Sequence, residues 1–157
     1  MKYYYNYSNK FCNLFIIEEN NTIHNVRFKF EEKLFIKKST ELKKLQTPLI
    51  KETIKQLDEY FSGKRKTFDL PLNAQGTEFQ KKVWQVLKAI PYGQTCSYEQ
   101  IAIKTGNPKA CRAVGLSNNK NPIVIIIPCH RVIGKNGKLT GYAGGLELKQ
   151  KLLDLEK

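Results

Sequence analysis

Five consecutive β-branched residues followed at once by proline, residues 123–128, constrain the fold more than any other stretch of the chain. Such a run predicts a short strand buried on both faces, because β-branched side chains favour extended backbone and no polar residue interrupts them. Proline cannot donate a hydrogen bond to a neighbouring strand, so Pro128 is expected to end this one. Cys129 and His130 are therefore predicted to lie in a turn held between apolar residues.

A cysteine beside a histidine is a candidate nucleophile, because the thiolate and not the thiol reacts. His130 and Arg131 directly follow Cys129, and proton-accepting and cationic neighbours are expected to lower the pKa of its thiol. The alternative is that Cys129 is a small apolar residue of the core. The two interpretations of Cys129, nucleophile or core residue, have to be distinguished by the rest of the sequence.

The chain is strongly basic, with 27 Lys and Arg against 14 Asp and Glu and a net charge of +13. Residues 1–73 carry 14 basic and 9 acidic residues (+5), and residues 74–157 carry 13 and 5 (+8). This excess predicts a polyanionic partner such as a nucleic acid. A lysine-rich solvated surface would give the same excess.

The four cysteines, at positions 12, 96, 111 and 129, have no CxxC pair, which argues against a disulfide framework or a zinc knuckle. Cys12 and His24 lack two further ligands at suitable spacing, so no metal site is expected. No apolar run approaches the roughly 18 residues of a membrane span, and no leader is evident. We therefore expect a reduced, cytoplasmic protein.

Residues 1–73 predict a sheet covered by one helix. Three aromatic and β-branched segments between residues 2 and 30 are separated by turn residues at 8–9 and 20–21, which predicts an antiparallel meander. Thr47 and Pro48 indicate the start of a helix that Gly63 ends. Residues 70–73 are interpreted as the crossing to a second lobe.

Residues 74–157 predict a helical lobe. Thr77 with Gln80, and Ser97 with Gln100, form the capping-box pattern that starts a helix. Gly106 is expected to cap the second helix, and a third helix is expected to follow with Asn107 as its N-cap and Pro108 in its first turn, running to about residue 118 and giving a helix-turn-helix. An ordinary pair of antiparallel helices is the alternative.

The third helix is expected to have a small inner face and a basic outer face. At 100° per residue the inner face holds Ala110, Ala113, Val114 and Ser117. Arg112 points away from that face. Cys111 is interpreted as a small filler of the core near Ala110.

Two features close the chain. The glycine-rich segment 141–145 lets backbone amides approach a ligand, although a flexible hinge has the same composition. In the final helix, residues 146–156, Lys149 shares a face with Leu152, Leu153 and Glu156. The leucines beside Glu156 are expected to let it fold back on the core.

These residues, in this order, resemble the O6-alkylguanine-DNA alkyltransferases, also called methylated-DNA–protein-cysteine methyltransferases. The resemblance runs from Gly76 through the Pro128-Cys129-His130-Arg131 core to Glu156. It implies an α+β protein with an N-terminal ribonuclease-H-like domain, residues 1–73, and a winged-helix-like, helix-turn-helix DNA-binding domain, residues 74–157. It also implies single-turnover DNA repair without a cofactor, in which a cysteine takes the alkyl group of O6-methylguanine, and in some cases of O4-methylthymine.

The resemblance assigns the chemistry to five residues. Cys129 would accept the alkyl group, His130 would reach the thiol through a water with Glu156 orienting the imidazole, Tyr98 would donate a proton toward the leaving purine, and Asn121 would brace the cysteine turn. A base pocket is implied at Val132, Tyr142, Ala143 and Gly144, where the backbone reads the base edge together with that of Cys129. Ala143 stands where some relatives have serine.

The implied partner is double-stranded DNA carrying O6-alkylguanine, bound by a monomer in the minor groove with the damaged base flipped out. Arg112 would fill the vacated place in the helix. Further DNA-binding positions are Lys109, Ala110, Gly115, Lys120, Arg131 and Lys135. Two rival hypotheses remain: an alkyltransferase-like protein that only marks lesions, and a winged-helix transcription regulator.

Overall fold

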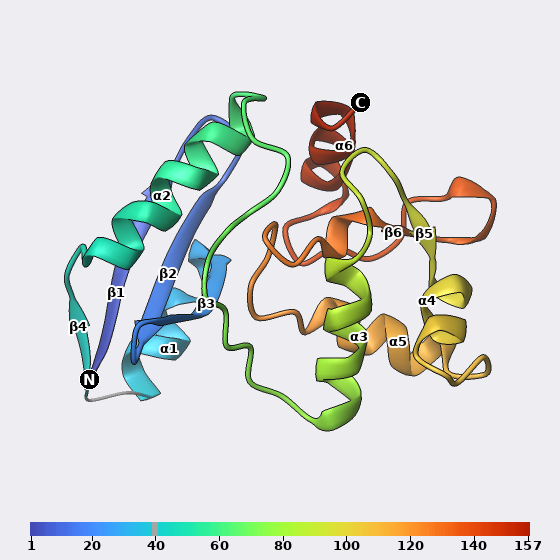
Figure 1. The fold of residues 1–157 in the computed structure, drawn as a ribbon, viewed down its shortest axis with the longest axis horizontal. Coiled ribbons are helices and arrows are strands. Elements are labelled where there is room, and N and C mark those ends of the chain that lie inside the picture. Colours follow the sequence, from blue (N-terminus) through green and yellow to red (C-terminus); the bar gives the residue numbers. More distant parts are fainter. Residues whose placement is uncertain (39–40) are drawn as a thin grey trace. The chain divides into compact units, whose positions relative to one another are not determined.

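A computed structural model describes residues 1–38 and 41–157. The chain divides into two compact units, Met1–Ala74 and Gln75–Lys157 (Figure 1). The first holds a four-stranded sheet and the second holds most of the helices. None of the helices in the described ranges is long and apolar enough to cross a membrane.

The sheet of the first unit begins with the predicted meander. β1 (Lys2–Ser8), β2 (Asn13–Glu19) and β3 (Thr22–Phe28) are antiparallel neighbours. Asn20 and Asn21 make the tight turn between β2 and β3 with positive φ angles of 52° and 60°, which asparagine tolerates better than most residues. β4 (Leu42–Lys44), which the sequence did not predict, adds in parallel to β1 and gives the order β3-β2-β1-β4.

Helix α2 (Pro48–Phe61) covers this sheet (Figure 1). As predicted, Pro48 occupies the first turn and the Thr47 hydroxyl accepts a hydrogen bond from the Ile50 amide. Gly63, with φ of +80°, follows the last turn. A short 3₁₀ turn, η1 (Lys29–Glu31), and helix α1 (Glu32–Lys38) were not predicted.

The segment 70–73 runs beside β3 in the first unit. The Ile23 amide donates to the Pro71 carbonyl at 2.8 Å, and the Asn73 amide donates to the Ile23 carbonyl at 2.9 Å. The stretch interpreted from sequence as a crossing therefore also extends the sheet by one bridge, between Ile23 and Leu72.

The second unit is built on four helices, α3 (Glu78–Lys88), α4 (Tyr98–Lys104), α5 (Cys111–Asn119) and α6 (Leu146–Leu155). Both predicted capping boxes are formed, at Thr77 and at Ser97. The indole nitrogen of Trp84 donates to the Ser117 carbonyl at 2.9 Å and so fastens α3 to α5. α4 and α5 form the predicted helix-turn-helix (Figure 1).

The start of α5 differs from the prediction. Residues 107–110 form a separate turn in which the Ala110 amide donates to the Asn107 carbonyl at 3.0 Å, and the helix begins only at Cys111 with Ala110 as its N-cap. Ala113, predicted on the inner face, is exposed, whereas Val114 and Ser117 are buried as expected. The inner face is therefore narrower than the sequence pattern indicated.

The predicted strand at residues 123–127 is wrong. All five residues are buried, but they form a tight turn closed by a bridge between Val124 and Ile127. Ile125 has φ of +72°, a left-handed conformation that β-branched residues rarely adopt. The side chain of Asn121 explains why a turn forms here instead of a strand. It accepts a hydrogen bond from the Ile123 amide and donates one to the Ile127 carbonyl, and so satisfies backbone groups that a neighbouring strand would otherwise satisfy.

Directly after this turn the chain forms a 3₁₀ turn, η2 (Cys129–Arg131), and then β6 (Val132–Ile133), which pairs in parallel with β5 (Cys96–Ser97). A further 3₁₀ turn, η3 (Lys135–Gly137), follows before the glycine-rich segment. The Cys129–His130 pair thus sits in a turn between buried segments, as predicted.

Candidate active site around Cys129

The Cys129 thiol is held by the turn that precedes it. The residue is 3% exposed, and its amide donates to the Ile127 carbonyl at 2.8 Å. Asn121 donates to the same carbonyl at 2.7 Å through its side chain, so it braces the turn from inside. The contact predicted for Asn121 is therefore present, and Cys129 has little freedom to move.

The expectation that neighbouring groups lower the pKa of Cys129 is wrong for the resting structure. Burial raises the pKa of this thiol to about 11, while a hydrogen bond from Asn121 and the charge of Lys149 act against that rise. Desolvation disfavours the thiolate and outweighs both. The thiol therefore needs a base to become a nucleophile.

His130 and Glu156 form a buried pair. Nε2 of His130 lies 2.7 Å from Oε2 of Glu156, and neither side chain is more than 1% exposed. Nδ1 of His130 is also buried and has no hydrogen-bond partner among the described residues. Burial lowers the pKa of His130, which the hydrogen bond to Glu156 partly opposes. A neutral imidazole with one oriented nitrogen and one available nitrogen is suited to accept a proton.

Arg131 does not lie beside the thiol or on the surface. Its Nε and Nη2 donate to the two oxygens of Glu156 at 2.8 and 3.1 Å, and its Nη1 donates to the Ile90 carbonyl at 2.7 Å. The residue is buried, and its guanidinium also stacks near the Tyr92 ring. Adjacent residues in a 3₁₀ turn point in different directions, which is why the predicted electrostatic effect on Cys129 is absent.

Lys149, for which the sequence suggested no role, is a second buried cation of the site. It is fully buried on α6, and its Nζ donates to the carbonyl of Thr140 at 2.7 Å and lies 3.5 Å from that of Gly141. Burial lowers the pKa of Lys149, and the Cys129 thiolate would raise it. The one sequence feature that could have indicated its burial is its position on the apolar face of the last helix.

Tyr98 belongs to the same network through Thr140. The Tyr98 hydroxyl donates to the Thr140 carbonyl at 3.3 Å and accepts from the Thr140 hydroxyl at 3.2 Å. A side-chain carbon at Gly115 would lie 3.8 Å from the Tyr98 ring, so α5 passes close to this tyrosine. Tyr98 and Lys149 thus converge on one segment, residues 140–141, which leads into the glycine-rich stretch.

The predicted base-pocket residues differ in exposure. Val132 is fully buried in β6, Tyr142 and Gly144 are half-buried, and Ala143 is exposed. Ala143 and Gly144 directly precede Gly145, which is the N-cap of α6 and has φ of +90°. These residues thus lie nearer the surface of the unit than Val132 does.

The predicted DNA-binding side chains lie outward, with one exception. Arg112 is exposed on α5, Lys109 and Lys120 are exposed in the turns that flank this helix, and Lys135 is exposed in η3. Ala110 is half-buried. Arg131 is the exception, as described above. Cys111, predicted to be a core filler, is half-buried, and its sulfur lies 4.0 Å from the Pro108 carbonyl.

No group of His, Cys, Asp or Glu in residues 1–38 and 41–157 is arranged to hold a metal ion. His24 faces Glu19, with Nδ1 3.5 Å from the carboxylate, and Cys12 lies in the turn between β1 and β2. All four cysteines are free.

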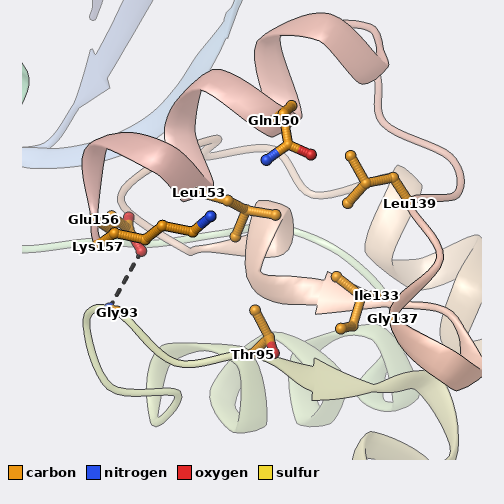
Figure 2. A pocket seen from close by; sticks show the side chains of 9 residues that line it. All are labelled: Gly93, Thr95, Ile133, Gly137, Leu139, Gln150, Leu153, Glu156 and Lys157. Atoms are coloured by element: carbon orange, nitrogen blue, oxygen red, sulfur yellow. Dashed lines mark hydrogen bonds between the residues drawn. The ribbon is translucent and has the colours of Figure 1, made fainter.

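Behind Glu156 lies a cavity of about 200 Å³ (Figure 2). Gly93, whose amide lies 3.5 Å from Oε1 of Glu156, forms one wall with Thr95, and Leu153 of α6 lies opposite. Neither Cys129 nor any residue of the predicted base pocket lines it. It is therefore distinct from that pocket.

Two family models match the chain. The 6-O-methylguanine DNA methyltransferase DNA binding domain matches residues 78–157, and the ribonuclease-like domain of the same family matches residues 2–74. The methylated-DNA–protein-cysteine methyltransferase of Methanosarcina acetivorans is 63% identical over 106 residues, which are 68% of each chain. The constitutive enzyme of that name from Bacillus subtilis is 46% identical over 159 residues, covering 100% of this chain and 96% of its own.

Solved structures agree with these relatives. The crystal structure of the Mycobacterium tuberculosis O6-methylguanine methyltransferase has a TM-score of 0.89 at 41% identity and covers 99% of this chain and 93% of its own. The M. tuberculosis OGT in complex with DNA has a TM-score of 0.88 at 42% identity and covers 98% and 92%. Together with the cysteine, histidine and glutamate of the site, these matches establish that the chain belongs to the 6-O-methylguanine DNA methyltransferase family.

Proposed function

We propose that this protein repairs DNA by transferring the methyl group of O6-methylguanine to its own Cys129. The observation that carries the proposal is the buried sequence Cys129-His130 whose imidazole is anchored by Glu156 at 2.7 Å and keeps Nδ1 available. A relative that matches the whole chain is named for this activity, and a structural neighbour at 42% identity is bound to DNA.

The transfer is a displacement at a saturated carbon. The Cys129 sulfur forms a bond to the methyl carbon while the bond from that carbon to O6 of guanine breaks, and the purine leaves with the electron pair. The proton of the thiol moves to Nδ1 of His130 through a water, since residues adjacent in sequence do not face each other directly. The Tyr98 hydroxyl donates toward the purine and neutralises its charge. The resulting thioether cannot be cleaved by the same groups, so each molecule reacts once.

The charges around the thiol support the roles of Cys129 as nucleophile and His130 as base. Because burial raises the pKa of Cys129, the resting cysteine is held as a thiol and is protected from adventitious electrophiles. The positive charge of Lys149 favours the thiolate once His130 has taken the proton. Arg131 acts here as a positioning residue that fixes the carboxylate of Glu156, and we propose this role for it instead of DNA contact.

A base stacked in a duplex cannot reach a buried thiol, so the damaged guanine has to be flipped out at a cost of a few kcal/mol. We assign Arg112, exposed on α5, to the space that the base leaves, and Lys109, Lys120 and Lys135 to phosphate contacts. Val132, Tyr142, Ala143 and Gly144 are proposed to line the base. In this scheme residues 74–157 perform the chemistry, as a monomer and in the cytoplasm.

The stoichiometry of repair tests the proposal. A duplex containing O6-methylguanine is incubated with increasing protein, and the remaining lesion is counted after the reaction has stopped. We expect one lesion removed per protein molecule, and none with Cys129→Ser. A protein that binds the lesion but leaves it methylated would instead be a lesion-marking relative, and indifference to the methyl group in a competition between methylated and plain duplex would favour a transcription regulator.

A further inference from the structure

Thr140, directly before the glycine-rich segment, contacts the hydroxyl of Tyr98 with two different groups. Its own hydroxyl donates a hydrogen bond to the Tyr98 oxygen at 3.2 Å, and its backbone carbonyl accepts one from the Tyr98 hydroxyl at 3.3 Å. Thr140 is exposed and Tyr98 is half-buried. Because water can serve hydroxyl groups at such positions, the stability of the fold does not explain why these two are paired.

The carbonyl of Thr140 holds the Tyr98 proton loosely. Nζ of Lys149 donates to the same carbonyl at 2.7 Å, which is a short, charge-assisted hydrogen bond. The Tyr98 contact of 3.3 Å is longer than the roughly 2.7–2.8 Å that is usual between two oxygens. When Tyr98 turns its proton to another acceptor, Lys149 still satisfies the carbonyl. The exchange therefore leaves no acceptor without a donor, and the Tyr98 proton is available to a substrate.

The hydroxyl of Thr140 acts on the oxygen of Tyr98 and not on its proton. A hydroxyl that accepts one hydrogen bond becomes a stronger donor in the next, because hydrogen bonds in a chain polarise one another. We propose that Thr140 is a positioning residue of methyl transfer, whose hydroxyl orients the Tyr98 phenol and strengthens its donation to the departing purine; this inference rests on the proposed function.

The hydroxyl contributes most where negative charge develops. During transfer the bond between the methyl carbon and O6 breaks, and its electron pair stays on the purine. Tyr98 donates to the purine, so part of the negative charge is displaced onto the Tyr98 oxygen, which Thr140 stabilises by its own donation. An interaction that is stronger in the transition state than in the ground state accelerates the chemical step. Loss of the Thr140 hydroxyl should therefore slow transfer and leave the affinity for the duplex unchanged.

Single-turnover transfer from a duplex containing O6-methylguanine, at saturating protein, tests the inference together with the affinity for that duplex. Thr140→Val removes the hydroxyl but keeps the branched side chain and the backbone carbonyl, and transfer should slow by about threefold to tenfold at wild-type affinity. Thr140→Ser restores a hydroxyl and should react within about twofold of wild type. Thr67→Val makes the same chemical change at an exposed position of the first unit and should match wild type.

A double-mutant cycle shows whether Thr140 acts through Tyr98. In a Tyr98→Phe protein the phenol oxygen is absent, so adding Thr140→Val should slow transfer no further. A valine variant with the wild-type rate, a serine variant as slow as the valine variant, or an equal slowing by valine in the Tyr98→Phe protein would each overturn the inference. A wild-type protein that transfers no methyl group would instead refute the proposed function itself.

Discussion

Replacement of Glu156 by glutamine should separate the two tasks of its carboxylate, which are to orient His130 and to neutralise Arg131. The carboxylate oxygens receive hydrogen bonds from Nε2 of His130 at 2.7 Å and from Nε and Nη2 of Arg131 at 2.8 and 3.1 Å. Glutamine keeps the shape of the side chain but has one acceptor oxygen, and its NH₂ group has to face a donor.

The expected loss of stability is large because the partners are buried. The side chains of Arg131 and Glu156 are 8% and 1% exposed, so the guanidinium would remain buried without its counter-charge. Removing one member of a buried ion pair costs about 3–5 kcal/mol, which lowers the Tm of a domain of this size by more than about 10 °C. Loss of an oriented general base slows a reaction by about 100-fold or more.

Thermal unfolding and single-turnover methyl transfer, the latter at a temperature where the variant is folded, measure the two effects separately. Glu147→Gln is the matched control on the same helix, because Glu147 is 88% exposed and pairs with the exposed Lys151. Its free energy of unfolding should stay within about 0.5 kcal/mol of wild type. A Glu156→Gln protein with wild-type Tm and wild-type transfer rate would show that the carboxylate neither stabilises Arg131 nor orients His130.

Three further perturbations address other parts of the site. In Lys149→Met the cation that favours the thiolate is lost, so the pKa of Cys129 should rise and transfer should slow by about tenfold for each unit of that rise. Iodoacetamide labelling of Cys129 across pH measures this pKa, and a labelling profile equal to that of the wild type would contradict the role of Lys149. Because burial lowers the pKa of His130, its imidazole should stay neutral below the ordinary imidazole range, and the transfer rate should fall only below about pH 6.5. A loss of rate centred above that pH would be inconsistent with His130 as the general base. Arg112→Ala should slow repair in duplex DNA by about tenfold and reaction with free O6-benzylguanine much less, since only the duplex requires flipping; equal losses would exclude the finger role.

The features of the fold that sequence alone predicted are those set by local chemistry. A capping box needs only residues three apart, and the boxes at Thr77 and Ser97 started helices where expected. The proline at position 48 and the glycine at 63 marked a helix for the same reason. The turn at Cys129 followed from Pro128.

The features that sequence reasoning missed depend on partners distant in the chain. Ile125 adopts a left-handed backbone that its own side chain disfavours, because Asn121 closes the surrounding turn. Arg131 meets a carboxylate 25 residues away instead of the adjacent thiol. Lys149 lies on an apolar helix face, which indicated burial, but its contacts with the carbonyls of Thr140 and Gly141 depend on the folded structure and could not be predicted.

Methyl transfer to Cys129 can be detected by peptide mass analysis of the protein after reaction with a methylated duplex. The chain has four cysteines, at positions 12, 96, 111 and 129, all of them free, so each can be compared in one experiment. The peptide containing Cys129 is expected to gain the mass of one methylene unit, and the peptides containing the other three cysteines are expected to stay unchanged. Repaired DNA with an unmodified Cys129, or a methyl group on another cysteine, would contradict this expectation.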